Sequence, residues 1–119
     1  MPGSNLTGPW GEALAAAYLR KKRYTLVACN YRCRFGEVDL IVQDRKYVVF
    51  VEVKLRTHGG TEAGQAAVTP QKRRRLVQAA RCYLGAHPEH AGRCVRFDVV
   101  TVTGEGVSHV PDAFSGGEW

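Results

Sequence analysis

The feature that most constrains the fold is a pair of short apolar segments separated by three polar residues. Residues 36–43 read GEVDLIVQ, and residues 47–54 read YVVFVEVK, which is the most strand-like run in the chain. Residues 44–46, Asp-Arg-Lys, form the predicted turn between them. Because so short a connection joins neighbouring antiparallel strands, we predict a β-hairpin over residues 36–54.

The flanking segments predict two helices. Pro9 suits the first turn of a helix that ends in the basic run 20–23, and Thr69 and Pro70 suit the N-cap and first turn of the second helix. The first helix carries two apolar stripes, and we therefore expect it to be largely buried. One stripe comprises Trp10, Ala13, Leu14, Ala17 and Tyr18, and the other comprises Ala15, Ala16 and Leu19. The predicted buried stripe of the second helix comprises Leu76, Ala79, Ala80, Tyr83 and Leu84.

Three more strands are predicted from their β-branched, aromatic or alternating residues, over residues 24–33, 94–102 and 107–110. The resulting order, α-β-β-β-α-β followed by a short last strand, predicts an α/β fold. A chain of 119 residues suits one domain, which we expect over residues 9–119, after a flexible arm at residues 1–8.

The composition is that of a soluble basic protein. Lys and Arg number 17 and Asp and Glu number 11, which gives a formal charge of +6 and a pI of about 9.4. This charge indicates either a nucleic-acid partner or a solvated basic surface. The first residues lack the apolar core of a signal peptide, and no apolar run approaches the ~20 residues that cross a bilayer. We therefore expect a cytoplasmic protein without membrane contact, with its four cysteines as reduced, buried thiols.

Two acids on the hairpin are predicted to face each other. If residues 44–47 form a four-residue turn, positions whose numbers add up to 91 pair across the hairpin, which places Asp39 opposite Glu52. Like charges placed directly opposite each other destabilise a sheet, and most neighbouring residues here are apolar. A hard divalent cation would compensate the two acids, because Mg²⁺ is held by one or two carboxylates together with water and substrate phosphate.

Lys54 lies two residues after Glu52 and therefore on the same face of its strand. Its ammonium group can orient or activate an attacking water, or stabilise charge that develops on a phosphate. The alternative is a surface hairpin in which Lys54 forms an exposed ion pair with Glu52 or Asp39, an interaction that contributes little.

Two further acids are open to two interpretations each. Glu12 is the single acid on the apolar stripe that contains Leu19, and it is either a site residue or a first-turn acid that interacts with the helix dipole. Glu37 shares a face with Asp39, and it either supports the site from its substrate side or is a solvated acid.

A basic cluster opens the second helix. Four cations at a helix N-terminus are unfavourable because the positive end of the helix dipole lies there, and a bound anion such as phosphate would offset this repulsion. The cluster therefore indicates either a phosphate-binding site or a solvated basic face. Arg56, which follows the hairpin, is a further candidate for contact with a nucleic-acid backbone, and the glycine-rich segment 59–64 is predicted to move to admit a substrate. The four helix residues are Lys72, Arg73, Arg74 and Arg75.

The hairpin also matches a known pattern. The run 36–41, GEVDLI, followed by residues 50–54, FVEVK, resembles the PD-(D/E)XK signature of restriction endonucleases and archaeal Holliday-junction resolvases. The ordered set of motifs over residues 8–114 resembles the YraN-like uncharacterised bacterial family, which is similar to those resolvases. The other motifs of this set are Gly11-Glu12, residues 31–36 (YRCRFG), Ala67-Val68 with Lys72, and residues 96–100 (RFDVV).

The resemblance implies a restriction-endonuclease-like fold, a mixed central sheet flanked by helices. It implies that Mg²⁺ or Mn²⁺ is held by Asp39, Glu52 and the backbone carbonyl of Val53, with Glu12 contributing directly or through water and Lys54 as the catalytic lysine. The implied function is phosphodiester hydrolysis in DNA, including branched, repair and recombination intermediates, by an endonuclease that forms a homodimer. A nucleic-acid-binding module without turnover, and RNA as the substrate, stay open as alternatives.

Overall fold

The computed structural model describes residues 9–56 and 68–115. The predicted arm, residues 1–8, and the segment 59–64 lie outside the described residues. The chain begins with helix α1 (Pro9–Lys21) and strands β1 (Thr25–Cys33), β2 (Gly36–Gln43) and β3 (Tyr47–Arg56), and it continues with helix α3 (Pro70–Ala86), a short 3-10 helix (Pro88–His90) and strands β4 (Cys94–Thr103) and β5 (Gly106–Phe114).

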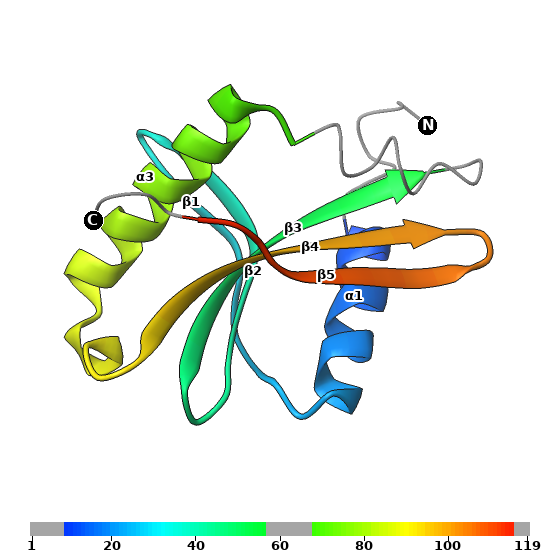
Figure 1. Cartoon of the computed structure of the whole chain (residues 1–119), viewed down its shortest axis with the longest axis horizontal. Helices are drawn as coiled ribbons and strands as arrows, with labels where there is room; N and C mark the ends of the chain where they lie inside the picture. The colour runs from blue at the N-terminus through cyan, green and yellow to red at the C-terminus, as the bar shows by residue number, and fades with distance from the viewer. Residues whose placement is uncertain (1–8, 57–67, 116–119) are drawn as a thin grey trace.

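The five strands form one mixed sheet in the order β1-β2-β3-β4-β5. Neighbouring strands are antiparallel except β3 and β4, which are parallel. A parallel pair needs a crossover connection, and α3 lies on that crossover. Figure 1 shows α1 and α3 on either side of the sheet. The fold is therefore the restriction-endonuclease-like α/β fold that the motifs indicated.

Each face of the sheet carries a hydrophobic core under one helix. Strand β3 is buried on both faces, which explains its nearly continuous apolar sequence. Phe50, at 0 % exposure, packs on the α3 side, and Val51, also at 0 %, packs on the α1 side. Burying one such side chain stabilises the fold by about 1.5–3 kcal/mol. The residues that α3 buries in its core are Leu76, Ala79, Ala80 and Tyr83.

Helix α1 buries one of its two apolar stripes, and the expectation that it is largely buried is wrong. Ala15, Ala16 and Leu19 pack on the sheet, whereas Trp10 is 57 % exposed and Leu14 is 37 % exposed. The physical reason is that, within residues 9–56 and 68–115, the main contacts of this helix are with the sheet, and a helix packed on one neighbour buries only one side.

Two smaller expectations have different outcomes. Thr69 caps α3 as predicted, because its Oγ1 accepts a hydrogen bond of 3.2 Å from the backbone amide of Lys72. The four cysteines are free thiols, but the prediction that they are buried is wrong: Cys29 and Cys94 are exposed, and Cys33 and Cys82 are only half-buried. In the part of the chain that the structure describes, no helix is both long and apolar enough to span a membrane.

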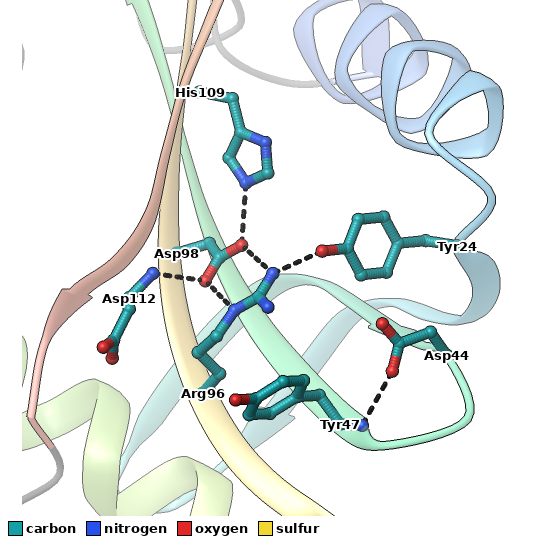
Figure 2. Close-up of polar contacts among 7 residues, drawn as sticks. All are labelled: Tyr24, Asp44, Tyr47, Arg96, Asp98, His109 and Asp112. Carbon is teal, nitrogen blue, oxygen red and sulfur yellow. Dashed lines mark hydrogen bonds and ion pairs between the residues drawn. The ribbon is translucent and has the colours of Figure 1, made fainter.

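A buried polar network lies on the α1 side of β4 (Figure 2). The carboxylate of Asp98, at 0 % exposure, accepts hydrogen bonds of 2.9 and 2.8 Å from Nε and Nη2 of Arg96. It also accepts 2.7 Å and 2.9 Å hydrogen bonds from Nε2 of His109 and the backbone amide of Asp112. Arg96 in turn donates to the hydroxyl of Tyr24. The network therefore joins β4, β5 and the segment after α1, and the alternation of polar residues in β4 marks a buried face rather than a solvated one.

Candidate active site

The predicted hairpin register is confirmed over the turn-proximal half of the hairpin. Leu40 pairs with Val51 and Gln43 pairs with Val48, and in both pairs the numbers add up to 91. The ladder between β2 and β3 ends at the Leu40–Val51 pair. Asp39 lies just beyond that end, where the two strands no longer pair.

Asp39 forms a hydrogen bond with the other strand through its side chain. Its Oδ2 accepts a hydrogen bond of 2.8 Å from the backbone amide of Val53. In a regular strand the N–H and C=O of one residue face the same neighbour, so the Val53 carbonyl also faces the β2 side of the strand. The structure thus brings the carboxylate of Asp39 and the backbone of Val53 together.

Glu52 and Lys54 form an ion pair of 3.1 Å between Oε2 and Nζ. The side chain of Lys54 is 9 % exposed and that of Glu52 is 20 % exposed, so this is not the solvated surface pair of the alternative interpretation. Glu52 and Asp39 line a cavity of about 570 Å³ between the β1–β2 end of the sheet and α3. We call it the acidic cavity; it is lined by Arg32, Cys33, Gly36, Glu37, Asp39, Glu52, Lys72, Arg75 and Leu76.

The negative charge of Asp39 is energetically unfavourable in the acidic cavity. Burial, and after it the negative charge of Glu52, raise the pKa of Asp39 to about 7, although the hydrogen bond from Val53 opposes the shift. A cation bound between Asp39 and Glu52 would remove this energetic penalty, and a metal ion is one such cation. Among the described residues, no three Asp, Glu, His or Cys side chains are grouped closely enough to hold a metal ion. The donors that this end of the hairpin offers are two carboxylates and a main-chain carbonyl, a set that would suit Mg²⁺ because this ion keeps several waters.

Glu12 lies on the α1 side of the sheet and does not line the acidic cavity. Its Oε1 accepts a 2.8 Å hydrogen bond from Nδ2 of Asn30, and the two residues line a separate hollow beside α1. Burial raises the pKa of Glu12, and its charge in turn contributes to the raised pKa of Asp39. Any contribution of Glu12 at a metal ion would therefore run through water or through charge.

Asn30 is a residue of this region that we did not predict. The β1–β2 register pairs Cys29 with Leu40 and Tyr31 with Val38, so Asn30 lies across from Asp39. Its backbone is left-handed, with φ of 52°, which turns it out of the regular strand. Asparagine is depleted in strands and tolerates this conformation, and its place inside a predicted strand was the signal that could have identified it.

The cationic wall of the acidic cavity comes from α3 and β1. Of the four predicted basic residues on α3, Lys72 and Arg75 line the cavity. Arg73 instead donates from Nε to the carbonyl of Val68, with a 3.1 Å bond, and its guanidinium stacks over Phe114. The sequence did not identify Arg32, which lines the cavity and lies 3.7 Å from Glu37.

Lys72 reaches the lysine of the hairpin. The nearby amine of Lys54 lowers the pKa of Lys72, and burial and the charge of Arg56 add to this shift. Arg56, the last residue of β3, is half-buried and does not line the acidic cavity. Arg74 is exposed on α3 and does not line it either.

Gly36 allows α3 to approach the start of β2. A Cβ on Gly36 would lie 3.1 Å from the carbonyl oxygen of Arg75 and 3.3 Å from its Cβ, closer than ordinary contacts. A glycine at this position therefore lets α3, with its cationic residues, pack close to the start of β2.

Comparison with known proteins places the chain in a family. The sequence profile of the uncharacterised protein family UPF0102 matches residues 11–102, which is most of the chain. The chain belongs to this family. It is the YraN-like family that the motifs indicated, and the matched segment contains every candidate site residue, from Glu12 to Arg75.

Relatives in UPF0102 match over nearly their whole length. The chain is 45% identical to a UPF0102 protein of Alkalilimnicola ehrlichii, over 92% of this chain and 86% of the relative. It is 44% identical to a UPF0102 protein of Anaeromyxobacter dehalogenans, over 98% and 92%, and 43% identical to one of Geobacter metallireducens, over 90% of both. These names give the family and no activity.

The raised pKa of Asp39 predicts a gain in stability when its charge is removed. We expect Asp39→Asn to raise the free energy of unfolding in EDTA at pH 8 by roughly 1 kcal/mol, or a few degrees in Tm, because Asn keeps an oxygen for the Val53 amide. Thermal denaturation measures this. Asp112→Asn, a matched change at an exposed acid, should shift Tm by much less. A lower Tm for Asp39→Asn would mean that its neighbours stabilise the charge.

Proposed function

We propose that this chain is a metal-dependent endonuclease that hydrolyses phosphodiester bonds in DNA, with branched or repair and recombination intermediates as its substrates. One observation carries the proposal: two acids, Asp39 and Glu52, meet in one cavity at the point where their strands separate, and Lys54 contacts one of them. Three cations, Arg32, Lys72 and Arg75, line the same cavity.

The proposed division of roles follows from the positions of these groups. Asp39, Glu52 and the Val53 carbonyl would hold Mg²⁺ or Mn²⁺, which when bound would polarise the scissile phosphate and lower the pKa of a water. Lys54 would direct its ammonium to the charge that develops on the phosphate, because its ion pair with Glu52 fixes its position. Lys72 and Arg75 would bind the phosphate backbone from the α3 side.

The test is a cleavage screen. Four-way junction, flap, single-stranded and duplex DNA are incubated with the full chain in Mg²⁺ or Mn²⁺, beside the Glu52→Ala protein. We expect metal-dependent cleavage, greatest on one branched substrate, that is lost in EDTA and in Glu52→Ala. Equal cleavage by both proteins would show that another site or a contaminant acts.

Salt-sensitive binding without any cleavage would favour the binding-module alternative, and cleavage of RNA would change the substrate class. The homodimer stays a prediction, which light scattering of the purified chain tests.

A further inference from the structure

A second cavity of about 570 Å³ lies at the opposite end of the β1–β2 hairpin from the acidic cavity. Three segments bound it: the connection from α1 to β1, the β2–β3 turn, and the residues before β4. Figure 1 shows the β2–β3 turn and the β1–β2 turn at opposite ends of these strands. We call it the basic pocket, and its cations are Arg23, Arg45, Lys46 and Arg93.

The positive charge of the basic pocket is not neutralised from within. Among the described residues Asp44 is the one acid that lines it, and its Oδ1 accepts hydrogen bonds of 2.9 and 2.7 Å from the backbone amides of Lys46 and Tyr47. In the described part of the chain, the ion pairs join other residues, and none involves a cation of this pocket. The pocket is therefore a concave surface with a net positive charge, which attracts anions.

Two hydrogen bonds join segments of the basic pocket that are far apart in the sequence. Nε of Arg93 donates to the carbonyl of Asp44 at 2.9 Å, and the amide of Cys94 donates to the carbonyl of Lys46 at 2.8 Å. These contacts fix the segment before β4 against the β2–β3 turn. The cations are consequently gathered by the fold before any ligand binds, which lowers the entropic cost of binding.

Arg23 occupies a position that would suit glycine better. The amide of Tyr24 donates to the carbonyl of Leu19 and that of Arg23 to Arg20, which is the Schellman arrangement at the end of α1. The backbone of Arg23 is left-handed, with φ of 75°. A side chain in this conformation costs about 1 kcal/mol relative to glycine, a cost that a ligand bound by the Arg23 guanidinium would offset.

We propose that the basic pocket binds a phosphate of the nucleic-acid backbone, at a point remote from the bond that is cut. Arginine side chains suit this ligand, because their planar donors match two phosphate oxygens at once. The choice of nucleic acid as ligand rests on the proposed function.

The spacing of the two cavities sets the length of nucleic acid required. Gln43, at the basic pocket, lies four residues from Asp39 and seven from Gly36 at the acidic cavity. At about 3.3 Å per residue, the cavities are ~13–23 Å apart. Duplex DNA rises about 3.4 Å per base pair, so one arm of at least ~4–7 base pairs would reach from one cavity to the other.

The test measures DNA binding in EDTA, without cleavage, by fluorescence anisotropy at several salt concentrations. The variant is Arg23→Gly with Arg45→Ala in the full chain, and Lys21→Ala, an exposed cation of α1 outside the pocket, is the control. We expect the double variant to bind at least ~10-fold more weakly near 0.1 M salt and to lose about one unit from the slope of log K against log salt. The control should lose less than half of that.

Arg23→Gly relieves the left-handed backbone, so the Tm of the double variant should equal or exceed that of the wild type, and weaker binding would not reflect unfolding. If the slope of log K against log salt is the same for the double variant and the control, the basic pocket does not bind phosphate, and the cleavage proposal is unaffected. A reduced slope in a protein that cleaves no substrate would support the pocket and contradict the nuclease. Absence of DNA binding even at ~20 mM salt would contradict both.

Discussion

Replacing Lys54 with alanine is expected to lower the rate of DNA cleavage by a factor of ~10²–10³. The ammonium group of Lys54 is almost buried and lies 3.1 Å from Glu52, so it is fixed beside the acids rather than moving in solvent. Fixed charge of this kind stabilises charge that develops in a transition state far more than it stabilises the bound substrate. The loss should therefore be in kcat, with KM for DNA unchanged within a few-fold.

The same substitution removes one partner of a buried ion pair, and its effect on folding must be separated from its effect on catalysis. Leaving Glu52 without its partner destabilises the metal-free protein, whereas a bound divalent cation would restore a partner. We therefore expect the Tm of Lys54→Ala to rise more on addition of Mg²⁺ than the Tm of the wild type does. Lys21→Ala, at an exposed position, should change neither rate nor Tm appreciably.

Lys54→Arg gives a finer test of the same residue. It keeps the positive charge but replaces a compact ammonium with a larger planar group beside Glu52. If Lys54 acts on the reacting phosphate, the arginine variant should recover stability without recovering the rate. A Lys54→Ala protein that keeps more than half of the wild-type rate would instead make the pair with Glu52 purely structural.

The hairpin was predictable because its information is local. A short polar turn between two apolar runs sets the register, and extending that register by one residue predicts Asp39 close to Glu52, just beyond the point where the observed ladder ends. The sequence could not show that the ladder stops at Leu40. Beyond that residue the backbone amide of Val53 donates to the side chain of Asp39, and such a hydrogen bond is visible only in the folded structure.

The other wall of the acidic cavity depends on tertiary structure. Lys72 and Arg75 differ from Arg73 and Arg74 only in the direction in which they leave α3, and that direction is set by how the helix packs on the sheet. Glycine at position 36 decides how closely the helix approaches, through a contact with Arg75 that is 39 residues away along the chain. The spacing of residues within one helix cannot predict a contact with a residue so distant in the sequence.

Asp98 illustrates a third limit. Its alternation with Phe97 and Val99 predicted β4 correctly, but period two says only that the two faces differ, not that the polar face is exposed. Burial of that face follows from Arg96, His109 and a backbone amide, which satisfy the carboxylate completely. The partners come from two strands, and the sequence alone does not pair them.

Replacing Asp98 with asparagine is expected to cost about 3–5 kcal/mol of unfolding free energy, a large part of the ~5–15 kcal/mol that stabilises a domain. Arg96 donates to both oxygens of this carboxylate and the Asp112 amide donates to one, so an amide NH₂ would meet a donor in either orientation. Arg96, whose guanidinium is held between the rings of Tyr24 and Tyr47, would also keep a buried charge without its counter-ion (Figure 2). Urea denaturation at pH 7 measures the loss, and Asp112→Asn is the control.

The pH dependence of the unfolding free energy in acid tests whether this stabilisation comes from the charge of Asp98. Burial alone would raise the pKa of Asp98, but the bonds from His109, Arg96 and the Asp112 amide outweigh burial and hold its pKa below the usual value. A carboxyl whose folded pKa is depressed stabilises the fold above its unfolded pKa of about 3.9 and loses this contribution as pH falls below that value. The wild type should therefore lose stability more steeply below pH ~4 than Asp98→Asn does. Parallel acid limbs in the two proteins would mean that the network stabilises the fold through packing rather than through the charge of Asp98.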